Sequence, residues 1–539
     1  MEKKRKQQWL MRGGLVLGGV LTGLCVSFPV IGALEWLSLV PAVLTFFVMV
    51  RDGGVSYPRL WRAGFLYFYS FSLVIFHWFF YMYPMDFTEL SHPQALGVVL
   101  VAWLGLSLLQ AIAGAFLPVL LGCLSRGQWM RRHSFLQVPL LAALWCIREW
   151  IQTLYWTGVP WGRLALGQAA VPAMLQTAQW FGSYLITFVL VAFNGTVAWI
   201  LLHPERLRFG AAVAASLLLF QCGAGVALTL REEKREPIRT VRVAAIQGNI
   251  GSADKWDMSV SDTFDIYYEW TRQAALAGAK LITWPESAVP VTLEDYPSYR
   301  KRLEDLAVEY GVTLMLGMFA PGETDAGYYN SILVVTPEGE WLRERYDKQH
   351  LVPFGEYVPM RKLVMALLPA LGNLSQLSSD VIPGKESVVF PTGVGDIGAL
   401  ICFDSIYEEL ARNSVRNGAQ LLLISTNDSW FYDSAAVKMH CAQAQLRAIE
   451  TGRSVVRAAS TGISALMTPT GKITLELGAL QEGMVVGEVE LYAHRTLYSR
   501  VGNLWVWLCL SGVALTGGLR VAERICQRKR RGTRKIQEA

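Results

Sequence analysis

The sequence predicts a polytopic α-helical membrane protein that carries an inserted α/β domain, and two observations lead to that fold class. The first is composition: the 539-residue chain is 53% hydrophobic and 17% charged, with a mean hydropathy of +0.31, whereas the charged share of a soluble protein is about a quarter. The second is distribution, because long apolar runs fill 1–230 and recur in 500–539. We therefore expect a transmembrane bundle over 1–230, an α/β domain over 231–499, and a last span with a basic tail over 500–539.

Eight segments are apolar and long enough to cross a bilayer. A helix rises about 1.5 Å per residue, so about 20 apolar residues cover a hydrocarbon core about 30 Å thick. Arg148 and Glu149 interrupt the end of the fifth segment, and charges there are costly in a helix that faces lipid. The predicted spans are 11–29, 33–50, 62–82, 95–124, 135–153, 178–202, 209–230 and 502–520.

Basic residues indicate the orientation of these spans. Lys and Arg cluster before the first span, between spans two and three, four and five, and six and seven, and after span eight, whereas 83–93 contain neither. The positive-inside rule therefore places both termini in the cytoplasm. Seven crossings then place 231–499 on the opposite face, which is the periplasm of a Gram-negative cell. This topology accounts for the net charge of +6, so we expect no nucleic-acid partner.

Residues 231–499 alternate between β-branched apolar runs and helical patterns. The alternation predicts a layered α/β sandwich rather than an all-β domain. The predicted strands are 241–246, 281–284, 312–317, 331–335 and 421–424, and the clearest helices are 264–278 and 299–310.

Three reactive residues lie at the ends of predicted strands or in loops of this domain. Glu286 follows the second strand after Pro285, at the edge where α/β active sites form. Lys348 lies in a segment bounded by Pro and Gly that has little helical or strand character. Cys402 follows a short buried strand and enters a polar turn, which suits a nucleophile.

The three residue types together could carry out acyl transfer. A thiol with a pKa of about 8.5 is mostly protonated at neutral pH, so a base such as Glu286 must take its proton during attack on an acyl carbon. The carbonyl oxygen becomes an oxyanion, which a fixed cation such as Lys348 stabilises. Taken singly, each residue has an ordinary interpretation, because an isolated Glu or Lys is usually solvated and a strand Cys is usually core.

The other cysteines give no sign of chemistry. The eight cysteines show no regular spacing, no CxxC pair and no Cys/His cluster of the zinc type. We therefore expect no disulfide framework, no metal and no organic cofactor. Five of them lie in or beside apolar runs, where inert packing is the expected role: Cys25, Cys123, Cys146, Cys222 and Cys509.

Three ordered motifs resemble those of a known superfamily. Trp284-Pro285-Glu286-Ser287, residues 346–356 and Ile401-Cys402-Phe403-Asp404 resemble the Glu, Lys and Cys motifs of the nitrilase superfamily. With the eight-span frame, they resemble its membrane branch, the apolipoprotein N-acyltransferases. Further matches are Gln247-Gly248-Asn249-Ile250, Lys255-Trp256, residues 427–431, Arg447, Glu450, Arg453 and Arg457.

The resemblance implies a fold and a reaction. It implies an α-β-β-α sandwich, and ping-pong transfer of an acyl chain from a phospholipid, typically phosphatidylethanolamine, through a cysteine thioester. The acceptor would be the α-amine of the diacylglyceryl-modified N-terminal cysteine of a lipoprotein, in the last step of bacterial lipoprotein maturation. We also expect membrane lipids as partners, the bacterial inner membrane as location, and a monomer.

The resemblance also implies roles for single residues. Cys402 would be the nucleophile, Glu286 the general base and acid, and Lys348 the oxyanion stabiliser. Glu356 matches a second family glutamate, which orients the lysine or shuttles protons; the alternative is that it only forms an ion pair with Lys348. Trp256 matches a tryptophan at the substrate entrance, although an indole near a membrane can also be an interfacial anchor.

The motif after the nucleophile departs from the family pattern. The family commonly has Tyr and then Glu, where this chain has Phe403 and Asp404. The missing hydroxyl and methylene put any hydrogen bonds of those side chains in doubt, whereas the backbone N–H of Phe403 remains a candidate second oxyanion donor.

Other functions make different demands on the same residues. A membrane-tethered amidase or nitrilase-type hydrolase would use the same three residues and let water resolve the thioester, so the spacing leaves that alternative open. A transporter would need ionisable residues at mid-membrane, whereas most charged residues here lie at helix ends. A non-catalytic binding domain would not need the three motifs.

Overall fold

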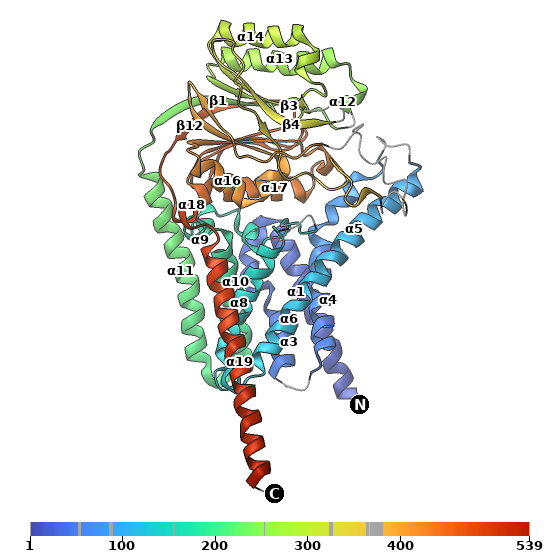
Figure 1. The fold of residues 1–539 in the computed structure, drawn as a ribbon, viewed down its shortest axis with the longest axis vertical. Coiled ribbons are helices and arrows are strands. Elements are labelled where there is room, and N and C mark those ends of the chain that lie inside the picture. Colours follow the sequence, from blue (N-terminus) through green and yellow to red (C-terminus); the bar gives the residue numbers. More distant parts are fainter. Residues whose placement is uncertain are drawn as a thin grey trace. The chain divides into compact units, whose positions relative to one another are not determined.

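The chain forms two compact units. The computed structural model describes residues 2–51, 55–85, 90–154, 157–252, 254–322, 327–362, 366 and 381–537. The helical unit comprises residues 1–77, 101–227 and 503–539, and the α/β unit comprises 78–100 and 228–502. Figure 1 shows their elements, coloured along the sequence. The α/β unit thus includes residues 78–100, where the Trp78 ring meets Phe431 edge-on at 4.7 Å.

The predicted eight spans are confirmed within the described part of the chain. Eight helical segments there are long and apolar enough to cross a membrane. The sixth differs from the prediction of one helix over 178–202, because Gly182 has a φ of 69° and separates α9 (Ala178–Phe181) from α10 (Ser183–Leu202). The other main helices are α1 (Glu2–Ser27), α3 (Val40–Arg51), α4 (Tyr57–Ile75), α5 (His92–Gly114), α6 (Phe116–Ser125), α8 (Gln137–Ile151), α11 (Leu207–Glu233) and α19 (Leu504–Gln537).

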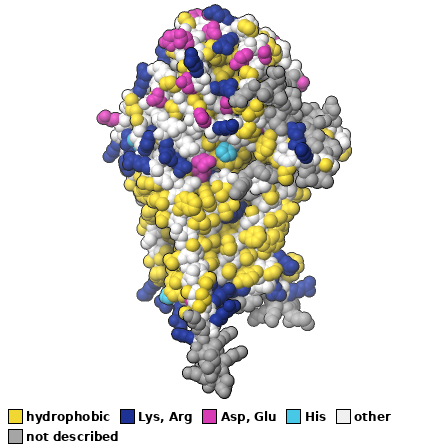
Figure 2. Space-filling model, in the orientation of Figure 1, with side chains coloured by type: hydrophobic (Ala, Val, Ile, Leu, Met, Phe, Trp, Pro, Cys, Tyr) yellow, Lys and Arg dark blue, Asp and Glu magenta, His cyan; other side chains and the backbone are white. Residues whose placement is uncertain are grey.

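The surface of the helical unit is apolar and its interior is tightly packed. Leu17, Leu219 and Leu515 are 52%, 71% and 67% exposed, and hydrophobic side chains dominate this surface in Figure 2. Such a surface needs a lipid rather than a water environment. Inside, a Cβ added to Gly19 of α1 would lie 2.5 Å from the Tyr67 carbonyl oxygen of α4. A small residue there lets the two helices approach closely.

The charged residues at the end of the fifth span do not face lipid. Glu149 is fully buried, where it accepts hydrogen bonds from the Thr187 hydroxyl at 2.7 Å and the Leu164 N–H at 3.1 Å. The Arg148 guanidinium lies over the Phe68 ring at 4.3 Å. These partners within the helical unit explain how a span ending in Arg-Glu can be accommodated.

Two six-stranded sheets form the centre of the described α/β unit. Their strand orders are β12-β1-β2-β3-β4-β5 and β11-β10-β9-β8-β7-β6. The strands are β1 (Arg239–Gln247), β2 (Leu281–Thr283), β3 (Thr313–Pro321), β4 (Tyr328–Val335), β5 (Tyr346–Asp347), β6 (Val389–Thr392), β7 (Gly395–Ile401), β8 (Leu421–Thr426), β9 (Val455–Ala459), β10 (Ser464–Met467), β11 (Ile473–Leu477) and β12 (Gly483–Leu491). The five predicted strands correspond to β1, β2, β3, β4 and β8.

Helices cover both outer faces of this pair of sheets, as predicted for an α-β-β-α sandwich. The helices α13 (Val260–Leu276) and α14 (Pro297–Tyr310) pack against the first sheet, where Phe264 and Leu303 join one buried cluster with strand residues such as Leu314. The helices α16 (Glu408–Arg416) and α17 (Ala435–Thr451) lie on the second sheet. Figure 1 shows the four layers.

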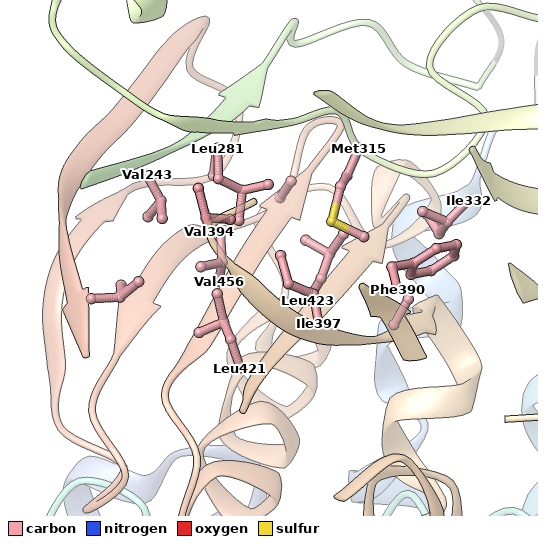
Figure 3. Close-up of a cluster of buried hydrophobic side chains, with 14 of the residues drawn as sticks. Val243, Leu281, Met315, Ile332, Phe390, Val394, Ile397, Leu421, Leu423 and Val456 are labelled. Atoms are coloured by element: carbon pink, nitrogen blue, oxygen red, sulfur yellow. The ribbon is translucent and has the colours of Figure 1, made fainter. Parts of the chain in front are cut away.

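The facing sides of the sheets form the main core. Val243, Leu281 and Met315 of the first sheet pack with Leu423 and Val456 of the second (Figure 3). The first strand of the unit, β1, pairs along its whole length with the last, β12, from Arg239↔Leu491 to Gln247↔Gly483. The two ends of the unit therefore lie together, which suits a domain inserted between two membrane spans.

Candidate active site

The three reactive residues follow strand ends that face one another across the sandwich. Glu286 follows β2 and Lys348 follows β5 in the first sheet, whereas Cys402 follows β7 in the second. The strands β1, β2 and β3 run parallel, as do β7, β8 and β9. Carboxyl ends of parallel strands are where α/β sheets place their ligands.

Lys348 is the centre of a buried ionic cluster. Its Nζ lies 2.7 Å from Oε1 of Glu286 and 2.8 Å from Oε2 of Glu356, and its side chain is 1% exposed. Asn330 on β4 donates from Nδ2 to both carboxylates, at 2.7 Å to Glu286 and 3.0 Å to Glu356. The structure thus brings together Glu286, Lys348 and Glu356, and adds Asn330, which the sequence did not single out.

The charges of this cluster control its protonation. Burial would lower the pKa of Lys348, but Glu286 and Glu356 together raise it well above its usual value, so the side chain remains an ammonium. Burial also raises the pKa of Glu356, which Lys348 opposes and the neighbouring Glu286 reinforces. The site therefore holds a buried ammonium between the carboxyl groups of Glu286 and Glu356.

Contacts from the opposite sheet fix Glu286. Its Oε2 accepts a hydrogen bond from the backbone N–H of Asn427 at 2.9 Å, just beyond the end of β8. The next residue, Ser287, has a φ of 42°, a strained conformation for a non-glycine residue. Lys255 holds it by donating from Nζ to the Ser287 carbonyl at 2.8 Å and hydroxyl at 2.9 Å.

Lys255 is a second buried cation in this region. Its side chain lies in α12 (Asp254–Asp257) and is 5% exposed. Burial lowers the pKa of Lys255 to about 8, although attraction to Glu286 opposes the shift. Lys255 therefore changes charge close to neutral pH, beside the turn that carries the candidate base.

Cys402 lies in a sharp turn between β7 and the short helix η9 (Cys402–Ile406). Its φ is 48° and the side chain is 9% exposed. The Sγ atom is 3.9 Å from the Asn427 carbonyl oxygen. Burial and Glu286 raise the pKa of the thiol well above its ordinary value, although Lys348 opposes the shift. The resting thiol is therefore protonated, and a base must take the proton as it reacts.

Asp404 links the nucleophile turn to the lysine loop. Its carboxylate is fully buried and accepts hydrogen bonds from the Tyr346 hydroxyl at 2.8 Å, the His350 N–H at 2.7 Å and the Gln349 N–H at 3.2 Å. Tyr346 and Gln349 flank the lysine segment closely in sequence. Asp404 therefore holds the Tyr346 side chain before Lys348 and the backbone just after it.

The other two residues predicted for the site are Phe403 and Trp256. The Phe403 ring meets Tyr407 edge-on at 5.5 Å, and as a phenylalanine it has no hydroxyl to donate. Trp256 belongs to α12, but its side chain lies outside the described residues.

One cluster beside the nucleophile has the atom types of a metal site. Potential ligand atoms of Cys402, Asp428 and His440 lie within 4.8 Å of one another. However, Asp428 is already bonded, with Oδ1 2.8 Å from His440 Nδ1 and Oδ2 2.7 Å from Arg457. A guanidinium at that distance disfavours a bound cation. The set is therefore a hydrogen-bonded network, and His440, which the sequence did not single out, belongs to it.

This arrangement suits acyl transfer through a thioester. A protonated thiol lies near an immobilised carboxylate, and a permanently charged ammonium lies beside both. Those are the groups needed to remove a proton from the nucleophile, stabilise an oxyanion and return the proton to a leaving group.

Two family profiles match the chain. The carbon-nitrogen hydrolase profile matches residues 242–497. The profile of the apolipoprotein N-acyltransferase N-terminal domain matches residues 18–196. The first range contains all of the candidate catalytic residues.

Known proteins resemble the chain over most of its length. A protein named apolipoprotein N-acyltransferase from Geobacter metallireducens is 33% identical over 94% of this chain and 94% of its own. A protein of the same name from Gloeobacter violaceus is 30% identical over 93% of this chain and 92% of its own. A solved amidase from Nesterenkonia sp. aligns with 50% of this chain and 98% of its own, at 23% identity and a TM-score of 0.38.

Proposed function

The chain belongs to the apolipoprotein N-acyltransferase family, and from this membership we propose that it acylates the N-terminus of lipoproteins. The acyl donor is a membrane phospholipid, and the acceptor is the α-amine of a diacylglyceryl-modified N-terminal cysteine. The chain is an acyltransferase and a multi-pass membrane protein. This membership favours transfer to an amine over the alternative of an amidase-type hydrolase.

In the first half-reaction, Cys402 attacks the ester carbonyl carbon of the phospholipid. Glu286 takes the thiol proton as the carbon–sulfur bond forms, because the thiol is protonated at rest. The carbonyl oxygen becomes an oxyanion, which the Lys348 ammonium stabilises together with the N–H of Phe403. The ester carbon–oxygen bond then breaks, and Glu286 returns the proton to the lysophospholipid oxygen. The product is a thioester on Cys402.

In the second half-reaction, the amine of the lipoprotein attacks that thioester. Glu286 accepts a proton from the amine, and the same two groups stabilise the second oxyanion. The carbon–sulfur bond breaks, and the proton passes from Glu286 to the Cys402 sulfur. The acyl chain is then held by an amide, and the enzyme is restored without any cofactor.

One observation carries this proposal most strongly: the Lys348 Nζ, 1% exposed, lies within 2.8 Å of two carboxylates beside the buried thiol. A buried charge is costly unless it is paired, and an ion cluster that served stability alone would not need a thiol beside it. We assign the first carboxylate, Glu286, to proton transfer, and the second, Glu356, to orienting Lys348.

A glutamine at position 356 separates the two roles considered for Glu356. If Glu356 orients the lysine, Glu356→Gln should slow thioester formation about tenfold to hundredfold, because an amide oxygen holds the ammonium more weakly than a carboxylate does. Stopped-flow labelling with a fluorescent phospholipid measures this rate. A rate within about twofold of wild type would leave Glu356 as a passive ion-pair partner.

The membrane setting follows from the substrates. Both keep their acyl chains in the bilayer, and extracting a chain into water costs about 0.8 kcal/mol per CH₂. We propose phosphatidylethanolamine as donor, the bacterial inner membrane as location, and a periplasmic catalytic domain with cytoplasmic termini. The functional division would be 1–230 and 500–539 in the membrane and 231–499 in catalysis.

The acceptor distinguishes transferase from hydrolase. Purified protein in detergent is given acyl-labelled phosphatidylethanolamine, with or without a diacylglyceryl peptide bearing a free amine. We expect a hydroxylamine-labile label on the protein that moves into an amide when the peptide is added. Release of the label as free fatty acid despite the peptide would make the protein a hydrolase.

Orientation can be tested with a matched pair of thiols. Cys526 in the basic tail and a cysteine introduced by Lys301→Cys, at a site 66% exposed in the α/β unit, are probed in intact cells with a membrane-impermeant maleimide. Peptide mapping should find label at position 301 but at Cys526 only after permeabilisation. The opposite pattern would invert the proposed topology.

A further inference from the structure

The carbonyl oxygen of Cys402 has two side-chain partners. Ser405 donates its hydroxyl to that oxygen at 2.7 Å, and His440 Nε2 lies 3.2 Å from it. Both side chains are buried, on η9 and on α17. The nucleophile's own peptide group is therefore held from two directions, at a residue whose φ of 48° is strained.

The partners of His440 indicate which ring nitrogens carry protons. Burial would raise the pKa of Asp428, but Arg457 and His440 together hold it well below its usual value, so its carboxylate only accepts. The Nδ1 atom, 2.8 Å from Asp428 Oδ1, is therefore a donor. Nε2 lies 3.2 Å from the Cys402 carbonyl oxygen, which only accepts, and 3.0 Å from the hydroxyl oxygen of Ser405, whose proton goes to that carbonyl. Both contacts of Nε2 are therefore satisfied by a donor at that nitrogen.

We infer that His440 is a positioning residue that, with Ser405, orients the peptide between Cys402 and Phe403 for oxyanion binding. This inference rests on the proposed function. A peptide bond is planar and trans, so its C=O and N–H point in opposite directions. Fixing the Cys402 carbonyl against His440 and Ser405 therefore fixes the direction of the Phe403 N–H, the proposed second oxyanion donor.

The network behind His440 explains why the ring is rigid. Asp428 accepts from the Thr426 hydroxyl at 3.1 Å and from Arg457 at 2.7 Å, so it cannot rotate freely. The Phe431 ring meets the imidazole edge-on, with centroids 6.5 Å apart. Preorganised donors stabilise developing charge without reorganising during the reaction, and this network supplies that rigidity from outside the reacting groups.

Two amide variants of His440 distinguish positioning of the Cys402 peptide group from general support of the fold. In His440→Gln, the amide nitrogen occupies the place of Nε2 and can still donate to the Cys402 carbonyl. In His440→Asn, the amide nitrogen occupies the place of Nδ1, so the contact with Asp428 is kept and the donor to Cys402 is lost. Both remove the ring, so a difference between them reports on the Nε2 donor.

Each full-length variant is assayed in detergent by two reactions of the same thiol. The first is thioester formation with fluorescent phospholipid, which passes through an oxyanion. The second is alkylation by iodoacetamide, in which sulfur displaces iodide and no oxyanion forms. We expect His440→Asn to slow thioester formation about tenfold to hundredfold and alkylation less than about threefold. His440→Gln should stay within about threefold of wild type in both.

Three results would overturn the inference. They are thioester formation by His440→Asn at the wild-type rate, equal losses in the Asn and Gln variants, and a parallel loss of alkylation, which would mean that the ring supports the thiol or the fold. If wild type itself forms no thioester, the proposed function fails first, so the two failures are distinguishable.

Ser405→Ala provides a second approach should the His440 variants fold poorly. It removes the other donor to the same carbonyl by deleting a single oxygen. We expect the same selective loss, slower thioester formation with nearly unchanged alkylation. Equal rates in wild type and Ser405→Ala would contradict the positioning role.

Discussion

Among the described residues of the α/β unit, two buried clusters combine one cation with two carboxylates, and only one of the two has the features of an active site. Lys348 lies between Glu286 and Glu356. Arg447, fully buried in α17, lies 2.8 Å from Glu450 and 3.9 Å from Glu408. The two clusters are alike in charge and burial, so neither property identifies the catalytic one.

The clusters differ in where their members come from. Arg447 and Glu450 are one helical turn apart, and Glu408 begins the neighbouring helix α16, so that cluster joins two helices on the same sheet. Lys348 and its partners lie in loops beyond strand ends, next to a thiol and to the strained residues Cys402 and Ser287. A nucleophile and backbone strain at strand ends therefore distinguish the site from a structural ion cluster.

The largest expected effect is at the nucleophile. Cys402→Ala should abolish thioester formation, because no other group replaces the sulfur. Cys441→Ala is the matched control: its thiol is also buried, but it lies in α17 and has no role in the proposal. Gel detection of a fluorescent acyl chain measures both, and equal labelling of wild type and Cys402→Ala would refute the assignment.

The second prediction removes the central cation from each cluster. Lys348→Met should lower the rate of thioester formation about 10²- to 10³-fold by removing an oxyanion stabiliser. Arg447→Met should instead lower stability, by about 3–5 kcal/mol for an unpaired buried charge, while correctly folded molecules keep most of their rate. Rates per active thiol and thermal unfolding midpoints measure the two. If Arg447→Met had normal stability but formed the thioester slowly, the Arg447 cluster could not be called structural and the contrast with the Lys348 cluster would fail.

A smaller effect is expected at the brace between the two catalytic loops. Asp404→Asn keeps the shape but replaces one accepting oxygen with a donor, so the Tyr346, Gln349 and His350 donors cannot all be satisfied. Thioester formation should fall about tenfold. Asp305→Asn, at a site 61% exposed, is the control and should form the thioester at the wild-type rate. A wild-type rate for Asp404→Asn as well would contradict the bracing role of Asp404.

The smallest prediction concerns pH. Because the pKa of Lys255 is lowered to about 8, the folded protein loses this proton at lower pH than the unfolded chain, whose lysine has a pKa of about 10.4. Between about pH 8 and 10.4, the free energy of unfolding of wild type should therefore rise relative to that of Lys255→Met. The difference between their unfolding midpoints should change by roughly a few degrees over that range. Lys301→Met, at an exposed site, should show no such trend.

Much of the fold could be predicted from local patterns. Continuous β-branched runs predicted β1, β2, β3, β4 and β8, and apolar length predicted the eight spans. The break at Gly182 was missed because a single left-handed glycine does not interrupt an apolar run. The pairing of β12 with β1 was also missed, since it joins segments more than 200 residues apart in sequence.

The residues of the candidate site also fall into those that the sequence indicated and those that only the structure revealed. Glu286, Lys348 and Cys402 follow strand ends and belong to recognisable motifs, so the sequence indicated them. Asn330 and His440 are polar residues inside a strand and a helix, and their importance depends on partners from distant segments. In the sequence neither differs from nearby polar residues such as Ser331 and Gln443, so each becomes informative only when its partners are known.

The most direct test of the account is the mass of the protein after brief exposure to a phospholipid with one defined acyl chain. We predict a single added acyl mass, mapped to the peptide containing Cys402 and removed by hydroxylamine, that forms on Arg447→Met but far more slowly on Lys348→Met. An adduct on another residue, or equally fast labelling of Lys348→Met, would contradict the claim that the Lys348 cluster is the catalytic one.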